Sequence, residues 1–216
     1  LKGLEFALEA GIDRASVFMS ASEAHNQKNI NKSIRDTYPV LGEVIRDTKA
    51  AGKLVTGYVS TVFDCPYEGR ISPEQVLEVC FRLVELGVDD LSLGDTIGTA
   101  VPTDVERLLE VLMKHFPKEK LILHFHDTRG MAIANIMTSL HYGINRFDST
   151  VGGLGGCPYA KGATGNVDTN DVLYLLHGIG IETGINEKKM QQAGLYIQNV
   201  LGKQLPSRSL AYISNA

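Results

Sequence analysis

Short apolar runs rich in β-branched residues recur along the chain, and stretches with helical spacing separate them. The runs predict five strands, at residues 15–19, 54–62, 90–93, 121–125 and 146–151. Between the runs, apolar residues follow at intervals of three and four, as at Val76, Val79, Cys80 and Leu83. The chain is therefore predicted to consist of repeated strand–helix units.

Helix boundaries are indicated by polar residues before the helix and by glycines after it. Ser72 is a predicted N-cap, with Pro73 in the first turn and Gln75 at the capping-box position. Thr103 and Glu106 predict a second capping box. Three glycines predict helix ends just before the next strand: Gly52, Gly87 and Gly143.

Strand–helix repeats fit either a doubly wound sheet or a (β/α)8 TIM barrel. Five polar residues at or just past the carboxyl ends of different strands favour the barrel, because barrel enzymes carry their chemistry there: Asp64, Asp95, His124, His126 and Asp148. No glycine fingerprint of a dinucleotide-binding fold is present. A closed barrel needs eight strands, so we predict an α/β TIM barrel that is incomplete here and holds about strands four to eight.

The start of the chain supports this expectation. Residues 1–11 predict an amphipathic helix that ends at Gly11, without an initiator methionine or the basic start of a signal peptide. We therefore expect residues 1–216 to form one catalytic barrel domain that is truncated on its N-terminal side.

The composition of the chain argues against some classes of binding partner. The chain is 44% hydrophobic without a long apolar run, which predicts a soluble globular protein and no membrane partner. A net charge of −4 and scattered basic residues argue against nucleic acid as a partner, so we expect a small ligand. Cys65, Cys80 and Cys157 are an odd number at wide spacing, which favours a reducing compartment over a disulfide framework.

Two histidines, His124 and His126, end the fourth predicted strand. Side chains two residues apart on a strand project from the same face, so the two imidazoles are placed to hold a divalent cation. Asp127 is expected to orient one of the rings. The pattern alone leaves magnesium, manganese and zinc open, and it also fits two unrelated polar residues at a strand end.

A glycine-rich stretch, residues 152–166, contains Cys157 and ends at Asn166. Glycines allow close approach of the backbone to a ligand, which favours a reactive over a structural role for Cys157. The Asn166 amide is either an oxygen ligand for a hard cation or a turn residue. We expect Cys80 to be a packing residue and Cys65 to be structural.

Asp95 follows a strand, where a carboxylate serves as an acid–base group or as a helix cap, and the sequence leaves both roles open. The remaining histidines are predicted to have no special role: His25, His115, His141 and His177.

Together these motifs resemble the hydroxymethylglutaryl-CoA lyase family, which is built on a TIM barrel. The resemblance also covers the motifs at residues 28–31, 57–60, 65–69, 92–98 and 124–128. Related carbon-chain-lengthening synthases share the histidine pair but lack the cysteine loop, so residues 152–166 discriminate between the two groups.

The resemblance implies cleavage of 3-hydroxy-3-methylglutaryl-CoA, a CoA thioester, to acetyl-CoA and acetoacetate. It implies Mg²⁺ or Mn²⁺ held by an aspartate, His124, His126 and Asn166. It further implies proton transfer by Cys157 and an acid or base role for Asp95. Four residues are expected to bind substrate: Tyr58, Ser92, Gly155 and Gly156. A homodimer is expected, in the cytoplasm or the mitochondrial matrix.

Two departures from the family pattern stand out. The family's aspartate ligand and a neighbouring arginine belong to a first barrel strand that this sequence does not show, and Asn170 stands where the family has a glutamate. The alternatives are therefore a catalytically incomplete fragment that pairs with another chain, or a related aldolase or synthase that acts on another acid.

Overall fold

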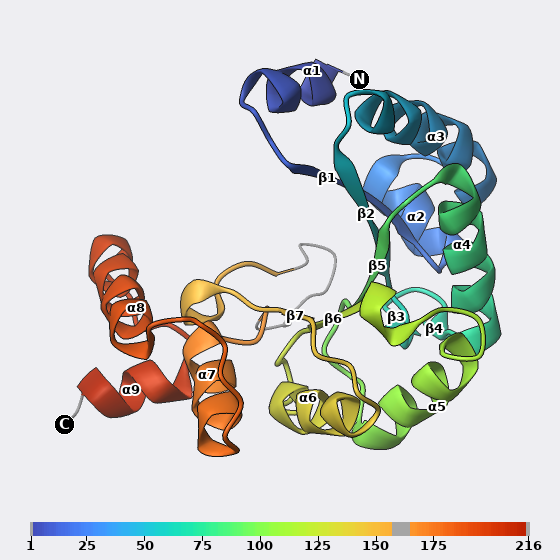
Figure 1. Cartoon of the computed structure of the whole chain (residues 1–216). Coiled ribbons are helices and arrows are strands. Elements are labelled where there is room, and N and C mark those ends of the chain that lie inside the picture. Colours follow the sequence, from blue (N-terminus) through green and yellow to red (C-terminus); the bar gives the residue numbers. More distant parts are fainter. Residues whose placement is uncertain (1, 157–164, 215–216) are drawn as a thin grey trace.

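The computed structural model describes residues 2–156 and 165–214, and its central feature is a five-stranded parallel sheet that curves into an arc (Figure 1). The strands lie in chain order across the sheet: β1 (Arg14–Ser20), β2 (Leu54–Ser60), β5 (Asp90–Asp95), β6 (Leu121–Phe125) and β7 (Phe147–Asp148). Each of the five predicted strands corresponds to one strand of this sheet, and the α/β class is confirmed. The expectation that the barrel is incomplete stays a prediction.

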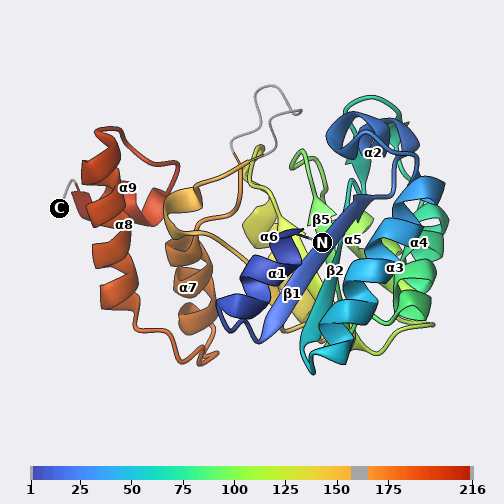
Figure 2. The ribbon, with the colours of Figure 1, turned by 90° about the horizontal axis from the view of Figure 1, so that it is seen from above.

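Helices follow the strands and cover the outer side of the arc. Figure 1 shows α3 (Ile34–Ala50), α4 (Pro73–Leu86), α5 (Pro102–Leu112) and α6 (Ala132–His141) along this side. A further group lies beyond β7: α7 (Thr169–Gly178), α8 (Glu187–Leu201) and α9 (Arg208–Ser214). The first helix, α1 (Lys2–Glu9), precedes β1, and Figure 2 shows α2 (Glu23–Ile30) at the end of β1. None of the described helices is long and apolar enough to cross a membrane.

Side chains alternate along the strands and so divide the sheet into two faces. In the two middle strands, Leu91, Leu93, Leu121, Leu123 and Phe125 are almost fully buried in the core between the sheet and the outer helices. The residues between them, such as Ser92 and His124, face the inner side of the arc. One face therefore stabilises the fold, and the other face carries the polar groups.

The helix boundaries confirm one predicted capping box and correct the other. Ser72 caps α4, since its hydroxyl accepts from the Gln75 amide and the Gln75 side chain accepts from the Ser72 amide. The box at Thr103 was wrong, because α5 begins at Pro102 and the Asp104 carboxylate accepts from the Val101 amide. The predicted helix-ending glycines all have positive φ: Gly52, Gly87 and Gly143.

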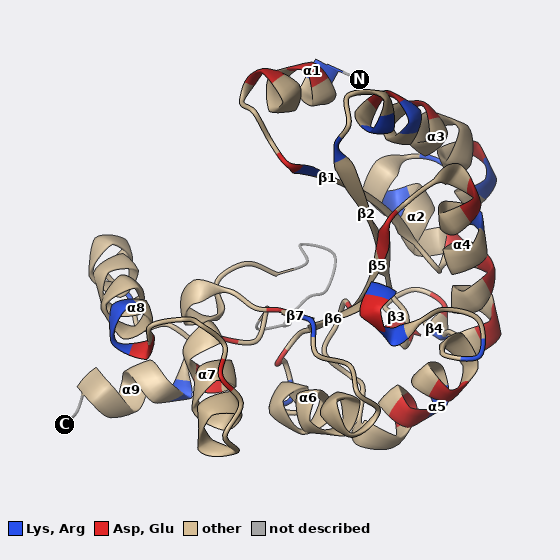
Figure 3. Ribbon diagram, viewed as in Figure 1, with Lys and Arg blue, Asp and Glu red and all other residues tan. Residues whose placement is uncertain are grey.

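Two further features were not predicted from the sequence. A two-stranded hairpin, β3 (Asp64–Cys65) and β4 (Gly69–Arg70), follows β2. At the amino ends of the strands, the Asp90 carboxylate pairs with both Arg14 and Arg146. Figure 3 shows that most other charged residues lie on the helices and loops around the sheet. The ion pairs of Asp90 thus form a charged cluster at the amino ends of the strands, opposite the ends that carry the two histidines.

Candidate functional site

A cavity of about 320 Å³ lies over the carboxyl ends of β2, β5 and β6. Five of the predicted site residues line it, namely Tyr58, His124, His126, Gly156 and Asn166. The other lining residues come from α2 and from the same strand ends: His25, Asn29, Val59, Ser60, Gly94 and Thr96. The motifs that the sequence singled out are thus brought together at the edge where parallel-sheet enzymes carry their chemistry.

The histidine pair forms the wall of this cavity, as the two-residue spacing predicts. The ring centroids of His124 and His126 lie 5.4 Å apart. Burial and the neighbouring His124 lower the pKa of His126 to about 4, so its ring is neutral at physiological pH. A neutral imidazole has a lone pair to offer a cation.

Asn166 lies beside His126, because the two residues form an isolated antiparallel β-bridge. The Asn166 Nδ2 donates to the Leu154 carbonyl at 2.9 Å, which leaves Oδ1 to face the site. Among the described residues, no partner makes a hydrogen bond of ordinary geometry to the buried atoms Asn166 Oδ1 and His126 Nδ1. Buried polar atoms are rarely left unpaired, so these two atoms are the ones that a bound cation would satisfy.

A cation at this cavity would need a ligand other than acidic, cysteine and histidine side chains. Within residues 2–156 and 165–214, no three His, Cys, Asp or Glu side chains are grouped closely enough to hold a cation by themselves. His124, His126 and the Asn166 amide are the donors that these residues supply at the cavity. Two nitrogens and one amide oxygen suit a divalent cation of borderline to hard character.

Asp148, rather than Asp127, contacts the histidine pair. The Asp148 Oδ2 lies 3.2 Å from His124 Nδ1. Burial would raise the pKa of Asp148, but hydrogen bonds from His124 and other neighbours hold it below its usual value.

The expectation for Asp127 was wrong. Its Oδ1 accepts from the Ala132 amide at the start of α6, and its Oδ2 accepts from Arg208 at 2.6 Å. The carboxylate is thus engaged in capping and ion pairing instead of orienting a ring.

The Asp95 carboxylate caps the turn that follows β5. It accepts hydrogen bonds from the backbone amides of Thr99 and Ala100 at 3.1 and 3.2 Å. Asp95 is only 1% exposed. Burial raises its pKa to about 6. The capping role is therefore seen directly, whereas the acid–base role stays a prediction, because Asp95 is not among the residues that line the cavity.

The cysteines divide as expected where they are described. Cys80 is fully buried on α4, and burial raises its pKa to about 12. Cys65 is buried and its sulfur accepts from the Ser22 hydroxyl at 3.0 Å and from the Tyr67 amide at 3.3 Å. Both are confirmed as structural and both are free thiols. Cys157, the predicted reactive thiol, lies outside the described residues.

The glycines of the loop shape the Asn166 site. Gly155 has φ +90°, and a Cβ there would lie 2.8 Å from Asn166 Nδ2. A side chain at this position would push the Asn166 amide out of place. Gly156 lines the cavity and Gly155 does not, although a substrate-binding role for both stays a prediction.

Sequence reasoning missed His25. It is 1% exposed near the start of α2, lines the cavity, and lies 6.3 Å from the Tyr67 ring. The one available signal was its position six residues after the predicted first strand. Asn170, the departure from the family pattern, is buried beside Asp168 and lies outside the cavity lining.

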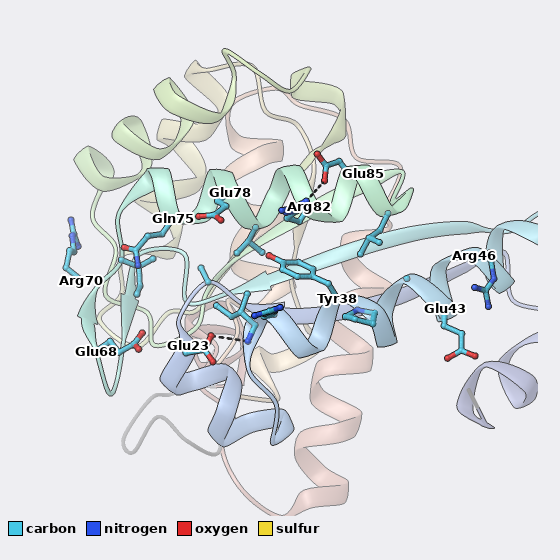
Figure 4. Close-up of a pocket in the computed structure, with 18 residues that line it drawn as sticks. Glu23, Tyr38, Glu43, Arg46, Glu68, Arg70, Gln75, Glu78, Arg82 and Glu85 are labelled. Carbon is cyan, nitrogen blue, oxygen red and sulfur yellow. Dashed lines mark hydrogen bonds and ion pairs between the residues drawn. The ribbon is translucent and has the colours of Figure 1, made fainter.

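A larger cavity, of about 1130 Å³, lies on the outer side between α3 and α4 (Figure 4). Figure 4 shows Tyr38 in its centre and charged residues such as Glu43 and Arg82 along its sides. None of the predicted site residues lines it. The candidate site is therefore the smaller cavity at the strand ends.

Comparisons with known proteins identify the family of the chain. The HMGL-like family model matches residues 1–197. Hydroxymethylglutaryl-CoA lyase YngG of Bacillus subtilis is 50% identical over 97% of this chain and 70% of its own length. The human cytoplasmic 3-hydroxy-3-methylglutaryl-CoA lyase is 47% identical over 96% of this chain, which spans 56% of the human protein.

Solved structures give the same result. The HMG-CoA lyase of Bacillus subtilis superposes with a TM-score of 0.95 at 49% identity, covering 99% of this chain and 72% of that one. An HMG-CoA lyase from Acinetobacter baumannii, solved with coenzyme A and 3-methylmalate, has a TM-score of 0.91 at 35% identity, covering 96% and 68%. The parallel α/β sheet thus has the TIM-barrel type of fold of these lyases. The chain belongs to the HMGL-like family, among the carbon–carbon lyases that cleave hydroxymethylglutaryl-CoA.

Proposed function

We propose that the cavity at the strand ends cleaves 3-hydroxy-3-methylglutaryl-CoA to acetyl-CoA and acetoacetate, with Mg²⁺ or Mn²⁺ held by His124, His126 and Asn166. Lyases of this family depend on a divalent metal. The observation that carries the proposal is the pairing of His126 with Asn166: both residues line the cavity, and each has a buried polar atom, His126 Nδ1 and Asn166 Oδ1, without a hydrogen-bond partner among the described residues. A CoA thioester fits the relative solved with coenzyme A.

The reaction is a retro-Claisen cleavage. The tertiary hydroxyl loses its proton, and the bond between that carbon and the thioester-bearing methylene breaks. The electron pair moves onto the leaving acetyl-CoA as an enolate, which is then protonated. A bound divalent cation would stabilise negative charge on the substrate oxygens.

The residues of this chain contribute orientation and polarity. Burial lowers the pKa of His126 and keeps the ring neutral, so it would hold a cation through a lone pair without repelling it. Tyr58 brings a phenol to the same cavity, where it is placed to contact a substrate oxygen. Protonation of the enolate is assigned to Cys157 by family resemblance alone.

Binding of Mn²⁺ and release of acetoacetate test the proposal together. We expect calorimetry to show one Mn²⁺ site in the wild-type chain and a loss of affinity in His126→Ala and in Asn166→Ala. His115→Ala is the matched control, because His115 stacks against Phe81 away from the cavity. Equal affinity in all four proteins would contradict the metal assignment.

The catalytic part is tested by a coupled assay for acetoacetate with Mg²⁺ or Mn²⁺. Activity that depends on the metal and on Cys157 would support the reaction as proposed. Metal binding without any cleavage would instead favour the catalytically incomplete fragment.

The oligomeric state and the compartment are proposed separately. Family resemblance favours a homodimer, and the two free thiols at Cys65 and Cys80 fit a reducing compartment. Sedimentation equilibrium would show a mass of twice 23.5 kDa if the dimer forms.

A further inference from the structure

Four side chains from four adjacent strands form one polar group on the inner face of the arc. They are Tyr58 on β2, Ser92 on β5, His124 on β6 and Asp148 on β7. Tyr58 is the register partner of Ser92, and His124 is the register partner of Asp148. The sheet itself therefore sets this arrangement.

Asp148 is the common acceptor of the group. Its Oδ2 accepts from Ser92 Oγ at 2.9 Å and lies 3.2 Å from His124 Nδ1. Tyr58 lies beside the same carboxylate, since burial and then the charge of Asp148 raise the pKa of its phenol. With Ser92 donating to it, the carboxylate has a fixed position from which to act on the His124 ring.

An ionised carboxylate only accepts hydrogen bonds. The ring nitrogen that faces it must therefore carry the hydrogen, which fixes His124 as the Nδ1–H tautomer. When this ring is neutral, its lone pair is on Nε2. A carboxylate behind a histidine sets the tautomer and orientation of metal-binding histidines in general.

We infer that Asp148 is a positioning residue, which holds His124 in the Nδ1–H tautomer with Nε2 free for a cation, and that Ser92 and Tyr58 serve this carboxylate. The inference rests on the proposed function only where it concerns the cation. Ser92 and Tyr58 thereby have a second role besides the expected contact with substrate. Asp148 takes the place of Asp127 as the carboxylate that orients the ring.

The tautomer is measured directly by ¹⁵N spectra of histidine-labelled protein without metal at neutral pH. The His124 signal is assigned by its loss in His124→Gln. We expect the Nδ1–H tautomer in the wild type. In Asp148→Asn the amide can donate as well as accept, so the Nε2–H tautomer should appear.

The same proteins are then titrated with Mn²⁺. We expect Asp148→Asn to lower the affinity about 10- to 100-fold, the range for loss of such a partner. Ser92→Ala removes one donor to Asp148 but leaves the carboxylate, so it should keep the tautomer and lose less affinity. Asp89→Asn is the control, because Asp89 pairs with Lys49 and with the Val55 amide before the start of β5.

The outcomes separate the inference from the proposed function. An Nε2–H tautomer in the wild type overturns the inference, even if Mn²⁺ binds. The inference is also overturned if Asp148→Asn folds and has the same His124 tautomer and the same Mn²⁺ affinity as the wild type. If the wild type shows the Nδ1–H tautomer and does not bind Mn²⁺, the inference on Asp148 stands and the proposed metal site fails. Should Asp148→Asn not fold, the wild-type and Ser92→Ala spectra still decide.

Discussion

Gly98 joins two motif loops at the site, and the absence of its side chain allows them to pack. It has φ +61°, and a Cβ there would lie 2.6 Å from Thr128 Oγ1 and 2.8 Å from the Thr128 amide nitrogen. We expect Gly98→Ala to lower the free energy of unfolding by about 2–4 kcal/mol, from backbone strain plus overlap. Because Thr128 follows the histidine pair, Mn²⁺ affinity should fall too. Urea unfolding and calorimetry measure both.

Gly52→Ala is the matched control for this prediction. Gly52 has φ +72°, but a Cβ there would meet nothing within 4 Å. Only backbone strain remains, about 1 kcal/mol, and Mn²⁺ affinity should not change. Equal losses in the two variants would show that close packing of the loops is not what requires glycine at position 98.

At the residue scale, strand alternation explains what could be predicted. His124 and His126 share the inner face because they are two residues apart, and the structure confirms this. The same parity places Ser92 on the inner face and Asp95 on the other, an argument that would have favoured the capping role of Asp95 from the sequence alone. His25 had no such signal, because the loop that follows β1 decides where it lies.

At the element scale, the two predicted capping boxes give a direct test. We expect Ser72→Ala to destabilise the protein by about 1 kcal/mol, because the Gln75 amide loses its acceptor. Thr103→Ala should change stability by less than about 0.5 kcal/mol, since Thr103 is exposed inside α5 and caps nothing. Thermal unfolding followed by circular dichroism compares them. A larger loss from Thr103→Ala would contradict the observed helix start.

The wrong box shows why helix ends are hard to place from sequence. Thr103 and Glu106 fit the local pattern, but Pro102 suits the first helical turn and Asp104 provides the actual carboxylate. Asp104 also pairs with Arg70 from the β3–β4 hairpin. This long-range partner, which no local pattern reveals, supports the start at Pro102.

At the scale of the whole molecule, the repeated strand–helix pattern was enough to predict the sheet, because each unit is encoded within neighbouring residues. The ion cluster at the amino ends of the strands was not predictable in this way. Asp90 is 76 residues from Arg14 and 56 residues from Arg146 in sequence. Only the parallel register brings β1, β5 and the start of β7 close enough for these contacts.

This cluster should make the stability of the sheet depend on pH. Hydrogen bonds from Arg146 hold the pKa of Asp90 below its ordinary value of 3.8. A lowered pKa stabilises the fold at pH values above 3.8, and this contribution is lost as the pH falls through the folded-state pKa. We therefore expect Asp90→Asn to lower the free energy of unfolding at neutral pH by about 1–3 kcal/mol, measured by urea unfolding. The difference from wild type should shrink in acid.

Glu85→Gln is the control, because Glu85 forms an exposed pair with Arg82 and its loss should lower the free energy of unfolding by less than about 0.5 kcal/mol. A difference for Asp90→Asn that stays constant into acid would mean that its charge does not stabilise the sheet.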